Sequence, residues 1–399
     1  MRKSLNIICV VGARPNFVKI APLMREWRKR PDVEACLLHT GQHYDHAMSE
    51  QFFKQLEIPR PDINLDVGSG SHAVQTADVM KRCEPVLEEL RPDVVVVVGD
   101  VNSTLAVALV AVKLGIPVAH VEAGLRSFDR SMPEEINRVL TDALADYCFI
   151  TEPSGLENLK REGADQRRLH LVGNVMIDAL FSHLRLAQAS GARKLFALRD
   201  REYQLLTLHR PSNVDQPEVL KSLLEAVAQI DPARPVLWPM HPRTRGRLGE
   251  EGLSHLRKTF PHLRVVPPLG YLEFLDLMSE AALVLTDSGG IQEETTALGV
   301  PCVTLRNTTE RPVTVTLGTN VLAGTHAARI LSSAQRQLAA GRRHVRIPFW
   351  DGQAAARIAK ILSGGVWRPT VSRPHFTKHR IPDPQKPANH PSPAASAPC

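Results

Sequence analysis

The chain alternates short apolar runs of strand length with longer segments whose apolar residues recur at helical spacing. In its first part, strands are predicted at "LNIICVV", "EACLLHT", "VVVVVG" and "PVAHV". Helices are predicted between them at about 17–30, 49–56, 74–90 and 103–114. The strand segments are continuous runs rich in valine and isoleucine, which is typical of strands buried on both faces of a parallel sheet.

The same pattern restarts after a helical, amphipathic segment at 173–200. The second set has strands at "QLLTLH", "PVLWP", "LRVVP", "ALVLTD" and "PCVTL", and helices at about 217–230 and 292–298. We therefore predict an α/β fold of two Rossmann-like, doubly wound domains that face each other across a cleft. The predicted domains are 1–175 and 176–352, and a last helix at 353–364 is a candidate to pack back on the first domain.

Length and charge narrow the functional classes. A chain of 399 residues is long for one core, in agreement with two domains. The net charge is +7, but residues 366–399 hold five Lys or Arg against one Asp, together with eight of the 30 prolines. This segment is predicted to be a disordered basic tail. The body is only mildly basic, which suits an anionic small molecule and argues against nucleic acid.

Membrane insertion, secretion and metal binding are not predicted. No apolar run approaches the roughly 20 residues of a membrane span. The basic and apolar N-terminus continues directly into "GARP" without a cleavage site, so we expect a first buried strand and a cytoplasmic protein. The six cysteines are scattered without C-x-x-C spacing, so neither a zinc site nor a disulfide framework is expected.

Two carboxylates end predicted strands, Asp100 after five valines and Glu122 in "HVEAG", and a third, Glu134 in "MPEEINR", stands at the start of the next segment. A buried acid is costly unless it is solvated, paired or used. Asp100 has an alternative role as a cap of the following helix. Glu134 has one in a capping box with Ser131 and an ion pair with Arg138. Glu122 has no evident capping role, and three acids in one crevice would suit the removal and return of a proton on carbon.

The clearest binding signal in the second half is "LVLTDSGGIQEE". A strand ends at Asp287, Ser288, Gly289 and Gly290 form a predicted tight turn, and a helix follows. Glycine backbone N–H groups at a helix N-terminus favour a phosphate. An ordinary strand-to-helix junction with Ser288 as N-cap is the open alternative.

Basic residues follow several predicted strands. Arg14 and Lys19 lie in "VVGARPNFVKIAPL", His209 and Arg210 in "TLHRPSN", and a further cluster in "PMHPRTR". Each residue alone is consistent with a solvated or structural side chain. Several clusters at strand ends together favour an anion site.

Taken together, these stretches resemble the non-hydrolysing UDP-N-acetylglucosamine 2-epimerases. The resemblance runs from about Asn6 to Leu362 and is carried by "GARPNFVKIAPL", "TGQHYD", "GDVNSTLA", "HVEAGLRS", "MPEEINR", "VGNVMIDAL", "DSGGIQEE" and "TERP". It implies a glycosyltransferase-B-like fold, a homodimer, and catalysis without metal or cofactor. It also implies reversible C2 epimerisation of UDP-N-acetylglucosamine to UDP-N-acetylmannosamine, in which UDP leaves to give a 2-acetamidoglucal and then adds back.

The resemblance also implies roles for particular residues. The catalytic candidates are Asp100, Glu122, Glu134 and His209, the last held near the diphosphate. The residues expected to bind the UDP-sugar are Arg14, Lys19, Arg138, Leu269, Phe274, Ser288, Gly289, Gly290, Glu294 and Arg311. Within this set, Glu294 corresponds to a ribose-binding acid, and Leu269 and Phe274 to the uracil pocket.

Alternatives remain open for the substrate and the reaction. "TGQHYD" and "GSGSH" recur in relatives that act on UDP-2,3-diacetamido-uronic acids, so a 2-epimerase of that sugar is the main alternative. Many bacterial relatives carry "QHRE" at Gln42–Asp45, in the region of an allosteric substrate site, so such regulation is not assumed here. A hydrolysing epimerase, a glycosyltransferase of the same fold and a non-enzymatic sugar-nucleotide sensor are further alternatives. The three acids favour epimerisation.

Overall fold

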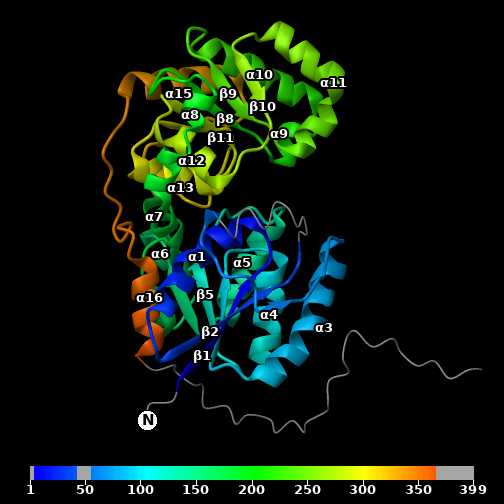
Figure 1. Ribbon diagram of the computed structural model, residues 1–399, viewed down its shortest axis with the longest axis vertical. Helices are drawn as coiled ribbons and strands as arrows, with labels where there is room; N and C mark the ends of the chain where they lie inside the picture. Colours follow the sequence, from blue (N-terminus) through cyan, green and yellow to red (C-terminus); the bar gives the residue numbers. More distant parts are fainter. Residues whose placement is uncertain (1–3, 43–54, 365–399) are drawn as a thin grey trace, which may run out of the picture.

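The computed structural model describes residues 4–42 and 55–364, which form two α/β halves stacked along the long axis of the molecule (Figure 1). The "HYD" of "TGQHYD", most of the helix expected near 49–56 and the tail at 366–399 lie outside the described residues. In the part of the chain described, no helix combines the length and apolar character needed to cross a membrane.

The first half is a seven-stranded parallel sheet in the order β3-β2-β1-β4-β5-β6-β7. Its strands are β1 (Leu5–Val11), β2 (Val33–His39), β3 (Ile63–Asn64), β4 (Val94–Val98), β5 (Val118–Ala123), β6 (Tyr147–Ile150) and β7 (Leu169–Leu171). Its helices are α1 (Arg14–Arg28), α3 (His72–Leu90), α4 (Asn102–Lys113), α5 (Pro133–Leu144) and α6 (Pro153–Arg161), with a 3₁₀ turn η1 (Gln166–Arg168). All residues of β4 and β5 are buried, as their continuous apolar runs predict.

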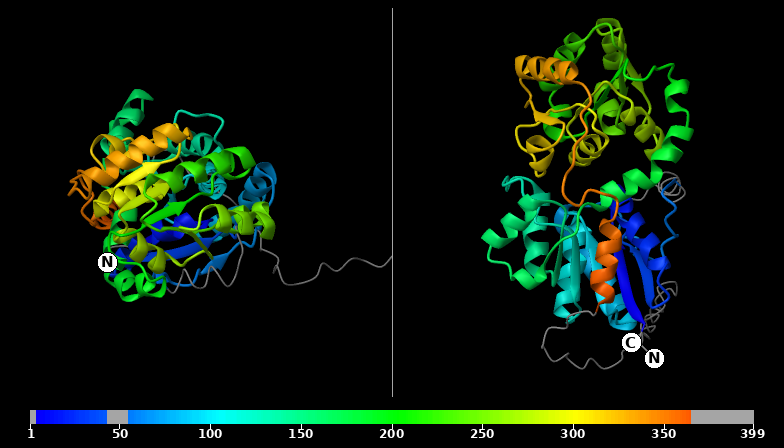
Figure 2. Two further views of the ribbon diagram at one scale, coloured as in Figure 1. Left: turned by 90° about the horizontal axis from the view of Figure 1, so that it is seen from above. Right: turned by 90° about the vertical axis from the view of Figure 1, so that its left-hand side faces the viewer.

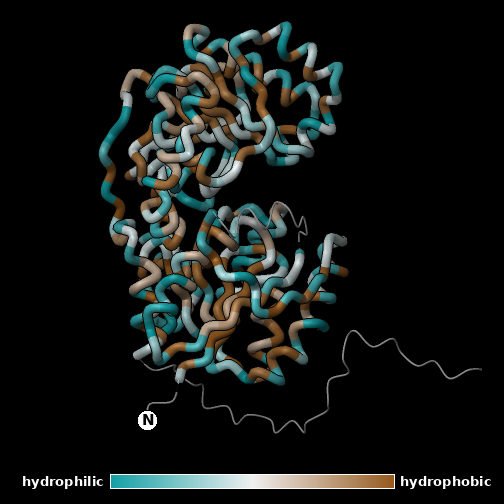
Figure 3. Tube along the Cα trace, viewed as in Figure 1, coloured by the Kyte–Doolittle hydropathy of each residue, from teal (hydrophilic) through white to brown (hydrophobic). Residues whose placement is uncertain are grey.

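The second half is a six-stranded parallel sheet in the order β10-β9-β8-β11-β12-β13. Its strands are β8 (Gln204–Thr207), β9 (Val236–Pro239), β10 (Leu263–Val266), β11 (Leu283–Thr286), β12 (Cys302–Thr304) and β13 (Asn320–Leu322). The helices that belong to it are α8 (Ala192–Leu195), α9 (Pro211–Val214), α10 (Pro217–Ile230), α11 (Pro242–Thr259), α12 (Tyr271–Ser279), α13 (Gly289–Leu298), α14 (Val313–Thr316) and α15 (Ala327–Ala340). Hydrophobic residues concentrate along the strands of both halves (Figure 3).

Both sheets are doubly wound, which confirms the predicted α/β class. In each sheet the chain starts in the middle, winds to one edge and returns to wind to the other, so the strand order reverses beside β1 and beside β8. Ligands of doubly wound sheets bind outside the carboxyl ends of the strands at such reversal points. In this molecule the two reversal points face each other, one from each half.

The chain passes between the halves twice (Figures 1 and 2). Helix α7 (Val175–Ala189) makes the first crossing and contacts both α1 and α12. The segment 341–353 makes the second and leads into α16 (Ala354–Ser363), which packs on α1 and α7. Asp178 on α7 accepts hydrogen bonds from the first two backbone N–H groups of α16, at 3.1 and 2.7 Å, and so caps it.

Some local predictions need correction. Helix α13 begins at Gly289, so the two glycines form its first turn and do not precede it. Helix α5 has Met132 as its N-cap with no side-chain capping bond, because the Ser131 hydroxyl donates to Asp129 instead. The predicted capping box is therefore wrong. Asp100 is not the cap of α4 either, since the N-cap is Val101 and has no side-chain capping bond.

Candidate active site

A cavity of about 530 Å³ lies between the two halves, at the carboxyl ends of both sheets. Its lining from the first half includes Lys19, Asp100, Met132, Glu134 and Arg138. Its lining from the second half includes His209, Arg210, Tyr271, Phe274, Ser288, Gly289, Gly290, Glu293, Glu294, Glu310 and Arg311. Most of the residues predicted for the site therefore surround one space.

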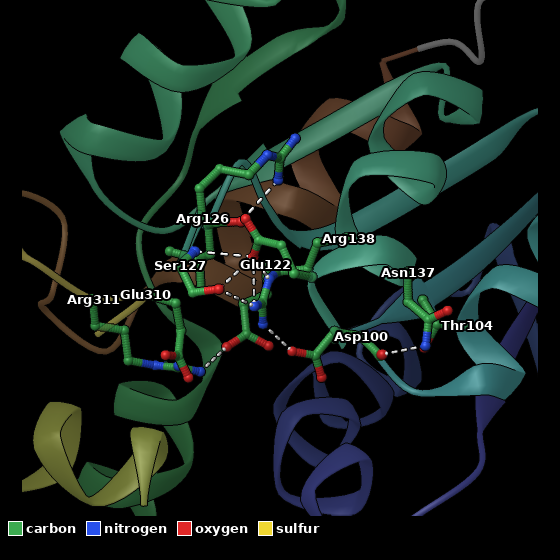
Figure 4. Close-up of polar contacts among 12 residues, drawn as sticks. Asp100, Thr104, Glu122, Arg126, Ser127, Asn137, Arg138, Glu310 and Arg311 are labelled. Atoms are coloured by element: carbon green, nitrogen blue, oxygen red, sulfur yellow. Dashed lines mark hydrogen bonds and ion pairs between the residues drawn. The ribbon is translucent and has the colours of Figure 1, made fainter. Parts of the chain in front are cut away.

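Two of the predicted acids, Asp100 and Glu134, are half-buried in the wall of this cavity. Asp100 Oδ2 lies 2.5 Å from Arg138 Nη1 (Figure 4). The other side of that guanidinium binds Glu135, with Nη2 to Oε2 at 2.7 Å, so the expected Glu134–Arg138 pair is replaced by a Glu135–Arg138 pair. Among the described residues Glu134 has no polar partner within bonding distance, so its carboxylate is available to a ligand.

Glu122 lies deeper, 4% exposed, and is not part of the cavity wall. One carboxylate oxygen binds Lys19. The other is 2.7 Å from Arg311 Nη2 in the second half (Figure 4). Burial alone would raise the pKa of Glu122, but the charges of Lys19 and Arg311 outweigh it and hold the pKa below its ordinary value. Lys19 is thus a buried partner of Glu122, and its interpretation as a solvated side chain is wrong.

The backbone at Glu122 is strained. Its φ is +79°, a left-handed conformation uncommon for a residue with a side chain, and the register with β6 shifts between Val121 and Ala123. Such strain occurs mainly where the surrounding structure requires it, often at functional sites. The bulge sets Glu122 apart from the regular alternation of β5.

Arg311 joins three acids from both halves. Besides Glu122, its Nη1 donates to Glu310 Oε1 at 2.8 Å and its Nε lies 3.0 Å from Glu293 Oε1. We call Lys19, Glu122, Glu293, Glu310 and Arg311 the buried ionic cluster.

The reversal point of the second sheet holds His209 through Asp287. His209 is 45% exposed, and its Nδ1 lies 2.7 Å from Asp287 Oδ1. The same carboxylate accepts the backbone N–H groups of His209 and Arg210 and the side-chain amide of Asn213. Burial raises the pKa of Asp287, but the bonds from His209 reverse the effect and lower it overall. Asp287 therefore fixes the imidazole so that Nε2 is left for a ligand.

The acids of α13 differ from those of the first half. Burial raises the pKa of Glu294 to about 8, despite a 3.2 Å hydrogen bond from the Tyr271 hydroxyl. Burial likewise raises the pKa of Glu293 to about 7, with Arg311 offsetting only part of the effect. The pKa values of these two carboxyls are therefore raised, whereas the pKa of Glu122 is lowered.

Among the described side chains, Leu269 does not line the cavity. Leu269 is half-buried and packs on the apolar core of the second half. Arg14 opens α1, next to the cavity-lining Pro15. Sequence reasoning missed Asp287, Tyr271 and Glu310. Glu310 could have been identified from the sequence, because it directly precedes Arg311 in "TERP".

The fold and the site together define a class: a two-domain nucleotide-sugar enzyme of the glycosyltransferase-B-like type. The model of the family described as UDP-N-acetylglucosamine 2-epimerase matches residues 25–363. The chain therefore belongs to the UDP-N-acetylglucosamine 2-epimerase family, which confirms the resemblance drawn from the motifs.

Individual relatives agree with this assignment. UDP-N-acetylglucosamine 2-epimerase of Methanocaldococcus jannaschii is 43% identical over 91% of this chain and 100% of its own. UDP-2,3-diacetamido-2,3-dideoxy-D-glucuronate 2-epimerase of Pseudomonas aeruginosa is 42% identical over 90% and 99%. A crystal structure of the M. jannaschii enzyme in complex with UDP-GlcNAc and UDP superposes with a TM-score of 0.83, covering 90% of this chain and 100% of that one.

Proposed function

We propose that this chain catalyses the reversible C2 epimerisation of UDP-N-acetylglucosamine to UDP-N-acetylmannosamine without releasing free sugar. The observation that supports the proposal is that one cavity is lined by Asp100 and Glu134 from the first half and by Gly289 and Gly290, in the first turn of α13, from the second. A carboxylate pair on one side and an anion site on the other match a reaction in which a proton and a diphosphate leave neighbouring carbons.

The second half binds the nucleotide in this proposal. The diphosphate lies on the first turn of α13, where Gly289 and Gly290 expose backbone N–H groups. Arg311, Lys19, Arg14 and the Nε2 of His209 supply positive charge or hydrogen-bond donors to it. Glu294 binds the ribose, Phe274 and the backbone near Leu269 flank the uracil, and Ser288 lies beside the glycine turn.

The first half handles the protons. A carboxylate removes the C2 proton while the C1–O bond to UDP breaks, which gives the 2-acetamidoglucal and bound UDP. UDP then adds back to C1, and a different acid delivers a proton to the opposite face of C2. We assign these transfers to Asp100, Glu134 and Glu122, the last becoming available when the diphosphate draws Lys19 and Arg311 away from it. Arg138 orients Asp100 through their ion pair.

The diacetamido-uronate is the second candidate substrate, because the Pseudomonas aeruginosa relative named for it is nearly as similar as the archaeal one. The extra carboxylate of that sugar would need a cation, and Arg210 lines the cavity. We further propose a homodimer, a cytoplasmic location, and a domain boundary at about residue 175.

Proton NMR of the purified protein with UDP-N-acetylglucosamine in D₂O tests the proposal. Deuterium at C2 in a mixture of gluco and manno UDP-sugars, without accumulation of UDP, is the expected result. Free N-acetylmannosamine with UDP would instead mean a hydrolysing enzyme. Deuterium exchange only with the diacetamido-uronate would mean that this sugar is the substrate. No deuterium exchange with either sugar would overturn the proposed epimerisation.

A further inference from the structure

A second ionic network lies directly beneath the proposed acids and has no place in the proton transfers. His120 in β5 is fully buried, two residues before Glu122. Its Nδ1 lies 2.6 Å from Asp142 Oδ1, and its Nε2 lies 2.8 Å from the Gly99 carbonyl oxygen. A carboxylate and a carbonyl only accept hydrogen bonds, so the ring donates from both nitrogens and carries both protons.

Asp142 is a carboxylate in this arrangement. Its Oδ2 accepts the Gly124 backbone N–H at 3.0 Å and Arg126 Nη1 at 2.7 Å, which leaves no acceptor partner for a carboxylic proton. Burial raises the pKa of Asp142, but His120 and Arg126 outweigh this effect and lower it. Arg126 is held in turn by both oxygens of Glu162, at 2.8 and 2.7 Å.

The network connects three segments, each of which carries one proposed acid. Gly99 is the residue before Asp100 at the end of β4. His120 and Gly124 flank Glu122 on the bulged end of β5. Asp142 lies on α5, whose first turn carries Glu134. One imidazolium and one carboxylate thus fix β4, β5 and α5 relative to each other.

A role in stability alone explains this arrangement less well. Replacing a buried ion pair by apolar residues is often neutral or stabilising, so such a pair is weak evidence for stability. Here the network binds backbone atoms beside the strained Glu122, where small displacements would be costly to catalysis. The bond from Gly124 N–H to Asp142 holds the residue that follows Glu122 by two positions.

We propose that His120 and Asp142 are positioning residues, which hold Asp100, Glu122 and Glu134 at their catalytic spacing through Gly99, Gly124 and α5. The proposal rests on the proposed function of those acids. Neither side chain lines the cavity, so neither is expected to contact the UDP-sugar.

Steady-state kinetics of C2 epimerisation in His120→Gln test the role, with UDP affinity measured by calorimetry. We expect kcat to fall about 100-fold, with KM and the UDP Kd within about three-fold of wild type, because the acids move while the nucleotide site does not. His170→Gln is the matched control: His170 is a half-buried histidine of the same sheet, on β7, in ring contact with Tyr147 and Phe149. It should leave kcat unchanged.

Asp142→Asn is the second variant, for the case in which His120→Gln does not fold. It keeps the shape of the side chain and should show the same selective loss of kcat. An unchanged kcat in a folded variant of either residue overturns the proposal. So does a loss shared equally between kcat and the UDP Kd, which would indicate general damage.

A measurement on the wild-type protein is independent of turnover. With ¹⁵N-labelled histidine, NMR should show two slowly exchanging ring N–H protons for one residue, both absent in His120→Gln. A single ring proton would overturn the network. If the wild type fails to exchange C2 of either UDP-sugar, the proposed function fails, while the two ring protons still decide whether the network exists.

Discussion

Two strand-to-helix junctions meet across the cleft, one after β5 and one after β11. The first has a nine-residue loop, 124–132, and presents side chains to the cavity. Its loop is tied down by Glu135, which accepts hydrogen bonds from the backbone of Ser127 and Phe128 and from Arg138. The second has only Asp287 and Ser288 between strand and helix, and presents glycine backbone.

This difference follows from the chemistry that each junction is proposed to perform. A phosphate group is bound by backbone N–H groups at a helix end, which need little supporting structure beyond a short turn. A proton donor must be aimed at one face of one carbon, so its side chain needs partners that fix it. The β5–α5 side therefore carries an extended ionic network, and the β11–α13 side carries two glycines.

The largest expected effect comes from Glu122→Gln. We expect turnover to fall at least about 1,000-fold, within the range of a lost acid/base group. UDP affinity should not weaken, because Lys19 and Arg311 lose a competing anion. C2 deuterium exchange and calorimetry measure the two effects.

Glu152→Gln is the matched control for that substitution. Glu152 is a buried acid of the first half that does not line the cavity, and one of its carboxylate oxygens has no hydrogen-bond partner among the described residues. We expect turnover within about three-fold of wild type for this variant, because Glu152 has no assigned part in the proton transfers. A Glu122→Gln enzyme that retained a tenth of its activity would remove Glu122 from the proton transfers.

Alanine substitutions at Gly289 and Gly290 test the second junction, between β11 and α13. A Cβ at Gly289 would lie 2.5 Å from Arg311 Nη1 and 2.9 Å from Glu310 Oε1, inside the buried ionic cluster. At Gly290 it would meet only Met176 Cε, at 3.4 Å. We expect Gly289→Ala to lower the free energy of unfolding by about 1–3 kcal/mol.

Gly290→Ala should stay within about 1 kcal/mol of wild type in urea unfolding, because alanine favours a helix. Met176 lines the same cavity, so the added methyl group reduces the space for a ligand. UDP affinity should therefore fall about tenfold, which corresponds to about 1.4 kcal/mol. Equal stability and unchanged UDP affinity in both variants would argue against α13 as the diphosphate site.

A further expected effect concerns the pH dependence of stability. The pKa of Glu294 rises from 4.5 to about 8 on folding, so the folded chain keeps a proton that the unfolded chain releases. Its contribution is complete below about pH 4.5 and is lost as the pH rises toward 8. Glu294→Gln should therefore reduce the loss of stability between about pH 5 and about pH 8, measured by urea midpoints. Tyr271→Phe keeps the carboxyl of Glu294, so its stability should still fall with rising pH as in the wild type.

Much of the fold was predictable because it follows from local pattern. The five buried valines of β4 and the helix at Pro217–Ile230 appear where periodicity predicted them. The start of α13 was misplaced because glycines usually indicate a turn, although here the helix begins with them. The motif order identified the family without any contact being known.

The site was less predictable because its partners are distant in sequence. Glu122 and Arg311 are separated by 189 positions, and no local spacing indicates that they meet. Local spacing was also misleading for Arg138, which forms ion pairs with Glu135 and Asp100 and not with Glu134. The capping box predicted for Glu134 rested on residues 131–134 alone. In the structure the Ser131 hydroxyl donates to Asp129 instead.

The return of α16 to the first half has a practical consequence for dissecting the protein. Ala354, Ala355, Ile358, Ala359 and Leu362 complete the same apolar core as Ile7 and Phe17. A recombinant fragment that stops near residue 175 would expose that surface and lack part of its core, so it should be insoluble or unstable. The first half is best obtained with the final helix supplied, by fusing 354–363 behind the first segment or by co-expressing the remainder of the chain.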